Sequence, residues 1–365
     1  MNKPVRVLIV DDSALIRQLL STLLAEDPDI EVVGTAGDPY IARERIKALN
    51  PDVITLDVEM PNMDGLTFLR KIMSLRPMPV IMISTLTQAG ADVTLEALEI
   101  GAVDFIAKPS SDALNALPAL ASELQKKVKV AARTRVRARP AAAAQPQGSR
   151  TRQLSPSASG KIIAIGASTG GVEALKVVLT QLPPDCPPIL VTQHMPPRFT
   201  AAFAERLNRE CPMRVSEAVD GEIIARGHVY IAPGSHHLEI VRFANQYRCS
   251  LNDGAPLSGH RPSVNVLFRS FARVCPNSTV GVILTGMGKD GADGMLELRK
   301  AGGTTIGQDE ATSLIYGMPH VAFERGAVMR QCALNKVADT ILDACEGKLS
   351  PQAQETLRQP MARTS

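Results

Sequence analysis

Apolar runs alternate with amphipathic patterns over the first part of the chain. The runs are short and rich in Val and Ile, which favours β-strands. Between them, apolar residues recur at the three- and four-residue spacing of a helix face, as in ALIRQLLSTLLAE. This alternation predicts a doubly wound parallel sheet in a domain over residues 1–124. The predicted strands are VRVLIV (5–10), EVVGTA (31–36), DVITLD (52–57), PVIMIS (79–84) and VDFIA (103–107).

A second alternation of strand and helix patterns covers residues 161–347. Its clearest strands are KIIAIGAS (161–168), PPILVTQH (187–194) and TVGVILTG (279–286), each followed by a helical pattern. The runs HVYIAP, HHLEIVRF and YRCSLN predict a small antiparallel excursion between them. We therefore expect an α/β protein with two doubly wound parallel-sheet domains.

The segment between the two patterns, residues 125–160, is rich in Arg, Ala and Pro and predicts a flexible linker. Residues 126–153 hold nine Lys or Arg and no acid, so the net charge of +3 arises locally and no nucleic-acid footprint is visible on the folded parts. The alternative is a docking arm for an acidic partner or for nucleic acid. Residues 348–365 are expected to form a frayed tail.

The composition is typical of a globular protein, with 45% hydrophobic and 21% charged residues. No apolar run reaches the roughly 18 residues that a bilayer-spanning helix needs, and the first residues lack a signal-peptide pattern. The six cysteines are widely spaced without a C-x-x-C pair, which favours reduced thiols over disulfides or a zinc site. We expect a cytoplasmic monomer without membrane insertion.

Three aspartates are predicted to meet at one edge of the first sheet. Asp11 and Asp12 follow the first strand, and Asp57 ends the third. The carboxyl ends of parallel strands share an edge, and carboxylates gathered there should not all ionise without a compensating cation. Oxygen ligands with space for water and phosphate suit Mg²⁺.

Two further polar side chains are expected at this edge. Ser84 ends the fourth strand and Lys108 follows the fifth, so a hydroxyl and an ammonium group can bind phosphoryl oxygens there. The alternative is that strand-end aspartates only cap the following helices. Capping accounts poorly for five such residues at the ends of four strands.

The motifs VLIVDDS, LDVEMPNMDG and AKPS, with the strand ending at Ser84, resemble the receiver domain of response regulators. The resemblance implies that a histidine kinase phosphorylates Asp57, that Ser84 and Lys108 contact the phosphoryl group, and that Phe105 is an aromatic switch. Serine in place of the commoner threonine at position 84 keeps the hydroxyl. The implied Mg²⁺ ligands are Asp11, Asp12, Asp57 and the backbone carbonyl of Glu59.

One serine stands among glycines where a strand becomes a helix, in GASTGG (166–171). Gly166-x-Ser168-x-Gly170 matches the nucleophile-elbow pattern, in which small neighbours let a tight turn expose the hydroxyl. A tight turn without a catalytic role gives a similar pattern, because glycines there often serve geometry alone. A phosphate-binding loop fits less well, since neither G-x-G-x-x-G nor a Walker lysine motif is present.

A nucleophilic serine needs a base, because its hydroxyl is a weak nucleophile at neutral pH. His194 ends the second strand of this domain as Ser168 ends the first, so both belong to one sheet edge. Asp290, in LTGMGKDGADG, reaches that edge as an orienting acid. The loop 286–288 can offer a backbone N–H as an oxyanion donor.

A different triad order, serine then acid then histidine, would recruit His320 from GMPHVAF with Asp290 or Asp309. We prefer His194, because MPH opens a helical pattern with no evident strand before it.

GASTGG, QHMP and LTGMGKDGADG resemble the catalytic domain of the chemotaxis protein-glutamate methylesterases, the CheB family. The resemblance implies a phosphorylation-activated esterase that hydrolyses glutamyl methyl esters and deamidates glutamines on chemoreceptors, without a cofactor for the esterase chemistry. It also implies a CheA-type histidine kinase as phosphodonor and a receiver that inhibits by occlusion. The implied roles are Ser168 as nucleophile, His194 as base, Asp290 as orienting acid, and Thr169 and the Met287 backbone N–H at the oxyanion site.

Two other functions remain open from the sequence. The output domain could bind DNA or RNA with the basic linker, although no helix-turn-helix or RNA-binding motif is recognisable. It could also be a regulated serine hydrolase for another ester or amide, because a triad does not reveal what carries the acyl group.

Overall fold

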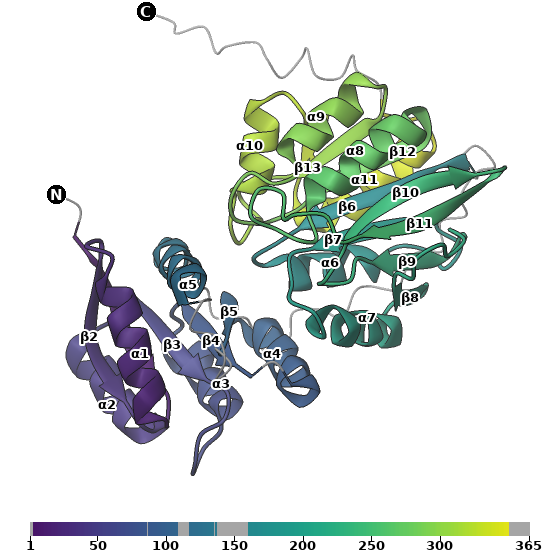
Figure 1. The fold of residues 1–365 in the computed structure, drawn as a ribbon. Helices are drawn as coiled ribbons and strands as arrows, with labels where there is room; N and C mark the ends of the chain where they lie inside the picture. Colours follow the sequence, from purple (N-terminus) through teal and green to yellow (C-terminus); the bar gives the residue numbers. More distant parts are fainter. Residues whose placement is uncertain (1–2, 86, 109–116, 135, 137–159, 350–365) are drawn as a thin grey trace, which may run out of the picture. The chain divides into compact units, whose positions relative to one another are not determined.

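The computed structural model describes residues 3–349 apart from 86, 109–116, 135 and 137–159. The chain divides into two compact units, Met1–Gln145 and Pro146–Ser365 (Figure 1). Most of the predicted linker and the predicted tail beyond Lys348 and Leu349 lie outside the described residues. Each unit has a parallel sheet with helices, and the predicted α/β class is confirmed.

The described part of the first unit holds a five-stranded parallel sheet in the order β2-β1-β3-β4-β5. All residues of β3 and β4 are buried, as expected for inner strands of a parallel sheet with helices on both faces. The apolar runs predicted these strands to within one residue. Their bounds are β1 Val5–Val10, β2 Ile30–Ala36, β3 Val53–Asp57, β4 Val80–Ser84 and β5 Asp104–Ala107.

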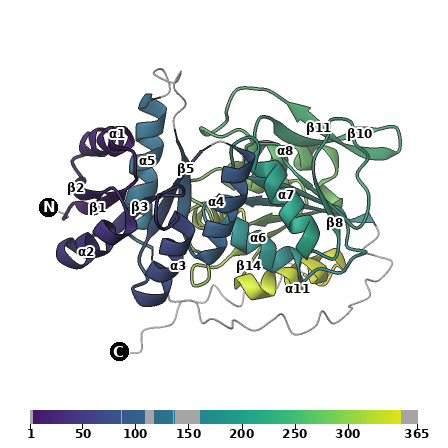
Figure 2. The ribbon, with the colours of Figure 1, turned by 90° about the horizontal axis from the view of Figure 1, so that it is seen from below.

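The helices of the first unit form two layers. The first and last helices, α1 and α5, contact each other on one face of the sheet, and α3 contacts α4 on the other (Figure 2). Side chains of Ser13, Asp38, Asp64 and Thr87 cap four of them by accepting backbone N–H bonds. The helices are α1 Ala14–Ala25, α2 Pro39–Leu49, α3 Gly65–Leu75, α4 Gln88–Ile100 and α5 Leu117–Ala131.

The predicted start of the linker at residue 125 is wrong, because helix α5 continues to Ala131. Leu124, Val128 and Ala131 are buried at helical spacing, which extends the helix into the basic run. The Lys127 ammonium pairs with the carboxylates of Asp104 and Glu123. Part of the basic charge assigned to the linker therefore belongs to the folded receiver-like unit.

The described part of the second unit holds a seven-stranded parallel sheet in the order β14-β13-β12-β6-β7-β9-β8. The strands that follow the central β6 in sequence, β7 to β9, lie on one side of it. The later strands, β12 to β14, lie on its other side. Ligands bind at such switch points in open α/β sheets. The strands are β6 Ile162–Ala167, β7 Ile189–Gln193, β8 Arg214–Glu217, β9 His228–Ile231, β12 Thr279–Ile283, β13 Thr304–Gln308 and β14 Arg330–Cys332.

The predicted antiparallel excursion is only partly correct. The run HVYIAP supplies β9, which pairs in parallel with β7 and β8 inside the main sheet. All four residues of β9 are buried, as expected for an inner parallel strand. Only β10 (His237–Phe243) and β11 (Gln246–Asn252) form the antiparallel pair, which packs on helix α8 (Val264–Val274).

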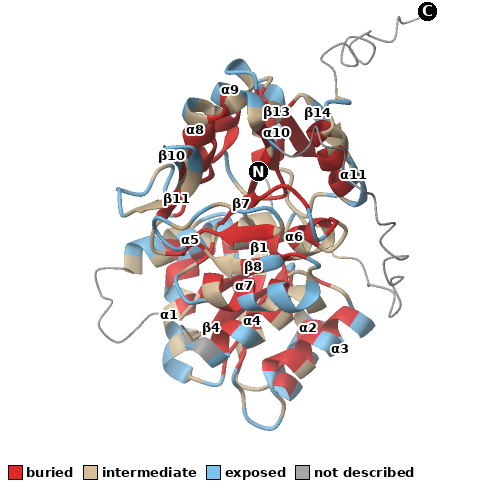
Figure 3. Cartoon of the chain, turned by 90° about the vertical axis from the view of Figure 1, so that its right-hand side faces the viewer, coloured by how far each residue is buried: buried red, intermediate tan, exposed pale blue. Residues whose placement is uncertain are grey.

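Helix α8 carries much of the core of this unit. Val264, Leu267, Phe268 and Phe271 recur on one face and are fully buried. Helices α8 and α9 contact each other, as do α6 and α11 (Figure 3). The other helical bounds are α6 Gly171–Leu179, α7 Phe199–Glu210, the 3₁₀ turn Pro276–Ser278, α9 Ala292–Lys300, α10 Met318–Glu324 and α11 Leu334–Cys345.

All six cysteines lie in the described part of the chain and are free thiols. Among the described residues, no helix combines the length and apolar character needed to cross a bilayer.

Candidate active site and phosphorylation site

Ser168 lies in the tight turn that joins β6 to α6. Its N–H donates to the Thr285 carbonyl at 3.0 Å, and its own carbonyl accepts from the Gly171 N–H at 2.7 Å. Gly170 has φ +79°, a conformation that side chains disfavour. A Cβ at Gly166 would lie 2.1 Å from Val264 Cγ1, so this glycine lets α8 approach the end of β6.

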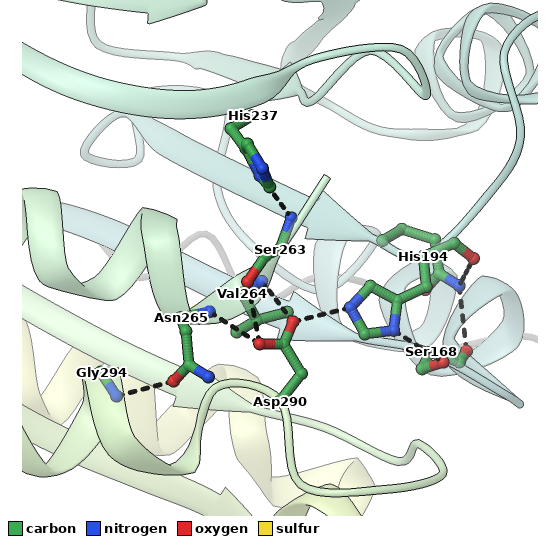
Figure 4. Close-up of polar contacts among 9 residues, drawn as sticks. Ser168, His194, His237, Ser263, Val264, Asn265, Asp290 and Gly294 are labelled. Atoms are coloured by element: carbon green, nitrogen blue, oxygen red, sulfur yellow. Dashed lines mark hydrogen bonds and ion pairs between the residues drawn. The ribbon is translucent and has the colours of Figure 1, made fainter. Parts of the chain in front are cut away.

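The ring of His194 lies between Ser168 and Asp290 (Figure 4). Nδ1 is 3.1 Å from Ser168 Oγ, and Nε2 is 2.9 Å from Asp290 Oδ2. An ionised carboxylate can only accept hydrogen bonds, so Nε2 carries a proton and Nδ1 can accept from the serine hydroxyl. The three predicted triad residues therefore meet in one chain of hydrogen bonds.

Asp290 is held as an anion although it is 1% exposed. Burial raises the pKa of its carboxyl, but hydrogen bonds from His194, the Ser263 hydroxyl and the Val264 N–H outweigh burial and lower the pKa. The Ser263 hydroxyl donates at 2.8 Å, and the Val264 N–H donates at 2.7 Å. These donors form the N-terminus of α8, where backbone N–H groups favour negative charge.

The sequence interpretation missed this role of α8. GHRPSVNVLF was not assigned a chemical function, although Ser263 directly before an apolar helical pattern is a helix-start signal. Further contacts support the same segment (Figure 4). His237 Nδ1 accepts from the Ser263 N–H at 3.1 Å, and Asn265 Oδ1 accepts from the Gly294 N–H at 2.7 Å. The start of α8, which holds the acid, is thus itself bonded to His237 and to the start of α9.

Ser263→Ala is expected to lower the free energy of unfolding by about 1–3 kcal/mol, because a buried carboxylate loses a donor. A displacement of Asp290 should also lower kcat/KM, by about 10-fold if the transition state loses about 1.4 kcal/mol. Urea unfolding and esterase kinetics check both effects. Ser278→Ala, before the amino end of β12 and so at the opposite sheet edge, is the control. Wild-type stability and activity of Ser263→Ala would contradict the role of this hydroxyl.

The loop predicted to supply the oxyanion donor lies beside the serine. A Cβ at Gly286 would lie 2.8 Å from Ser168 Cβ, so the backbone passes close to Ser168. The Thr285 hydroxyl donates to the Thr169 carbonyl at 3.0 Å and links this loop to the serine turn. Thr169 is buried and Met287 is partly exposed. Their oxyanion roles remain predictions that this placement supports.

The alternative triad members make other contacts. His320 is 46% exposed on α10, and its Nε2 lies 3.4 Å from Glu324 Oε1 on the same helix. Asp309 Oδ1 accepts from the Thr312 N–H at 3.0 Å and caps a turn. The geometry therefore favours His194 over His320 as the base.

The predicted acid pocket forms at the carboxyl edge of the first sheet. Asp11 and Asp57 are buried, whereas Asp12 is exposed. Lys108 Nζ lies 2.8 Å from Asp57 Oδ2 and 3.2 Å from Asp11 Oδ2. Burial, with repulsion from Asp11, raises the pKa of Asp57 to about 6 although Lys108 opposes the shift. Burial lowers the pKa of Lys108, but its two carboxylate partners outweigh this effect and raise it.

This pocket fits a divalent cation. Asp11, Asp12 and Asp57 each place a carboxylate oxygen within 4.8 Å of the others. Asp11 Oδ2 and Asp57 Oδ2 are buried. Among the described residues, no neutral group donates a hydrogen bond to either atom. Lys108 pairs with two of the three carboxylates, which leaves negative charge for Mg²⁺ to neutralise. Glu59 donates its N–H to Asp57 Oδ1 at 3.3 Å, and its carbonyl as a ligand remains a prediction.

Ser84, predicted to contact the phosphoryl group, and Phe105, the predicted aromatic switch, are both buried. The Ser84 hydroxyl accepts from Thr94 Oγ1 at 2.7 Å and donates to the Gly90 carbonyl at 3.2 Å, both on α4. Phe105 is 5% exposed, and the Lys127 ammonium lies 5.3 Å from its ring centroid. Their phosphorylation-dependent roles remain predictions.

Both units match known protein families. Residues 163–341 match the CheB methylesterase family and residues 7–117 the response regulator receiver domain. Protein-glutamate methylesterase/protein-glutamine glutaminase 1 of Caulobacter vibrioides is 58% identical over 94% of this chain and 99% of its own length. The corresponding protein of Pectobacterium atrosepticum is 52% identical over 93% of this chain and 96% of its own length.

The CheB methylesterase catalytic domain of Thermotoga maritima is a solved structure that matches with TM-score 0.50 and 37% identity. The match covers 51% of this chain and 99% of that domain. The chain belongs to the CheB methylesterase family and carries a response regulator receiver domain at its N-terminal side.

Proposed function

We propose that the second unit hydrolyses γ-methyl esters of glutamate side chains on chemoreceptors. The observation that carries this proposal is the hydrogen-bonded chain Ser168–His194–Asp290 on one sheet edge. The names of the relatives identify the acyl group as a protein glutamate and add glutamine as a second substrate. Deamidation is the same acyl chemistry with ammonia as the leaving group.

The mechanism proceeds in two acyl-transfer steps. Ser168 Oγ attacks the ester carbonyl while His194 Nδ1 takes the hydroxyl proton. The tetrahedral oxyanion forms beside the Met287 N–H and Thr169. Methanol then leaves with the proton from His194, and a water molecule, activated by the same nitrogen, hydrolyses the acyl-enzyme. Asp290 holds the Nε2 proton and stabilises the imidazolium without taking the proton itself.

The first unit receives the regulatory signal in this proposal. A histidine kinase of the CheA type donates a phosphoryl group to Asp57, and Lys108 stabilises the added charge. Asp11, Asp12 and Asp57 would hold Mg²⁺, which would supply positive charge beside the phosphoryl oxygens. Ser84 reaches the phosphoryl group by leaving its contacts on α4. We also propose that the protein is a cytoplasmic monomer and that it binds no nucleic acid.

Methanol release from methylated receptor membranes, with and without a small phosphodonor, tests the function directly. The proposal expects release by the wild-type protein and faster release with the phosphodonor. Absence of both would contradict it. Salt-dependent retention of nucleic acid in filter binding, without methanol release, would instead support a nucleic-acid output.

Removal of residues 1 to about 150 is expected to raise kcat/KM above that of the unphosphorylated full-length protein. All triad groups lie after residue 160, so the receiver has nothing to supply to the reaction and regulates by inhibition. Couplings of this kind are about 1–3 kcal/mol, which corresponds to roughly 5- to 150-fold. The measurement compares a 151–365 fragment with the intact chain, after circular dichroism confirms folding. A folded fragment less active than the intact chain would show direct activation by the receiver.

A further inference from the structure

A second histidine lies flat against the candidate base. The rings of His260 and His194 have centroids 3.7 Å apart, and their planes differ by 6°. His194 already uses both ring nitrogens, one towards Ser168 and one towards Asp290. His260 therefore contacts the remaining surface of the base, its ring face.

A short turn holds His260 in this position. Leu257 and His260 exchange two backbone hydrogen bonds of 3.0 Å each. The two residues between them, Ser258 and Gly259, have φ values of +56° and +82°, typical of a tight two-residue hairpin turn. The imidazole is thus carried by a closed loop of backbone and not by an extended flexible segment.

The same stretch of chain also holds the acid. Three residues after His260, Ser263 donates its hydroxyl to Asp290, and Val264 donates its N–H. Residues 257–264 therefore contact the Ser168–His194–Asp290 chain twice, at the ring face of the base and at the carboxylate of the acid. A displacement of this segment would release both contacts together.

We propose that His260 is a positioning residue whose ring fixes the orientation of His194 and stabilises its protonated form. Rotation of the His194 ring would break both in-plane hydrogen bonds, and a parallel neighbour at 3.7 Å blocks that rotation. Transfer of the serine proton makes His194 a cation. An aromatic face stabilises such a cation more than it stabilises the uncharged His194 ring, so the contact strengthens during the reaction.

The inference rests on the proposed function and predicts which property of His260 matters. The planar ring is required, and its nitrogens are not. His260→Ala and His260→Gln remove the ring, whereas His260→Phe keeps a planar ring without a titratable group. We expect Ala and Gln to lower kcat about 10-fold, with KM within about twofold of wild type, and Phe to restore most of kcat.

The experiment uses the full chain and two readouts. The first is methanol release from methylated receptor membranes at a range of substrate concentrations, which separates kcat from KM. The second is the rate of phosphonylation by a fluorophosphonate, in which Ser168 Oγ bonds to phosphorus, fluoride leaves and the serine proton passes to His194. This reagent needs no receptor, so it reports on the serine and its base even if the substrate proposal fails.

Phe243→Ala is the matched control, because Phe243 is a 65% exposed ring at the tip of the β10–β11 hairpin. It should leave both rates unchanged. Thermal unfolding of each variant identifies loss of the fold. Wild-type rates in His260→Ala would overturn the inference. A folded His260→Phe protein as impaired as His260→Ala would also overturn it, because the ring nitrogens would then be needed. A wild-type protein that reacts with the fluorophosphonate but releases no methanol would contradict the proposed function alone.

Discussion

Ser168→Ala and His194→Ala are each expected to lower kcat/KM for methanol release by on the order of 10³-fold or more. The serine variant lacks the proposed nucleophile, and the histidine variant lacks the ring nitrogen that lies 3.1 Å from Ser168 Oγ and would take the serine proton. Because the residues act as a unit, the double variant should be little worse than either single variant. Steady-state kinetics on methylated receptor membranes measure these losses.

His320→Ala is the control for this prediction, since His320 is a half-exposed histidine of the same domain that contacts Glu324. Its activity should stay close to that of wild type. A severe loss in His320→Ala together with an active His194→Ala would show that the wrong histidine was assigned. Each variant needs an unfolding curve, because the 7% exposed side chain of His194 also contributes to packing.

Asp57→Asn is expected to abolish stimulation by a phosphodonor and to leave basal esterase activity measurable. The amide has the shape of the carboxylate but cannot accept a phosphoryl group, and Lys108 keeps Asp11 as a partner at 3.2 Å. The variant should fold, because removing one buried carboxylate relieves repulsion within the acid pocket. Activity is measured over a phosphodonor titration with Mg²⁺ present.

Acid-labile phosphate on the protein provides the direct readout for Asp57. Wild-type protein should incorporate it, and Asp57→Asn should not. Incorporation at the wild-type rate would place the phosphorylation site elsewhere. Loss of basal activity in a folded Asp57→Asn protein would show that the receiver contributes to the reaction itself.

Periodicity was sufficient to predict most of the sheet. The strands of the first unit are short runs rich in apolar residues and bounded by turn residues, and all five lie within one residue of their predicted limits. The position of the site could be predicted from a general rule, because side chains at the carboxyl ends of adjacent parallel strands are neighbours. Ser168 and His194 are such a pair, at the ends of β6 and β7.

Prediction failed where partners are distant in sequence. The apolar pattern of HVYI fits an antiparallel strand as well as a parallel one, and only the position of β9 between β7 and β8 decides its direction. Gly166 also has a packing role that the sequence pattern does not predict, besides its predicted part in exposing Ser168. In the structure it gives Val264 room to bring its N–H to Asp290. A one-dimensional pattern does not contain that contact.

The separation of the triad residues along the chain has a consequence for protein synthesis. Ser168 and His194 are 26 residues apart, whereas His194 and Asp290 are 96 apart. Translation therefore delivers Ser168 and His194 early, and Asp290 only after β12, which must insert beside β6. A nascent or prematurely terminated chain that stops before residue 290 carries the reactive serine without its complete machinery. If Asp290 acts as proposed, we expect such a fragment to hydrolyse receptor esters far more slowly than the complete chain.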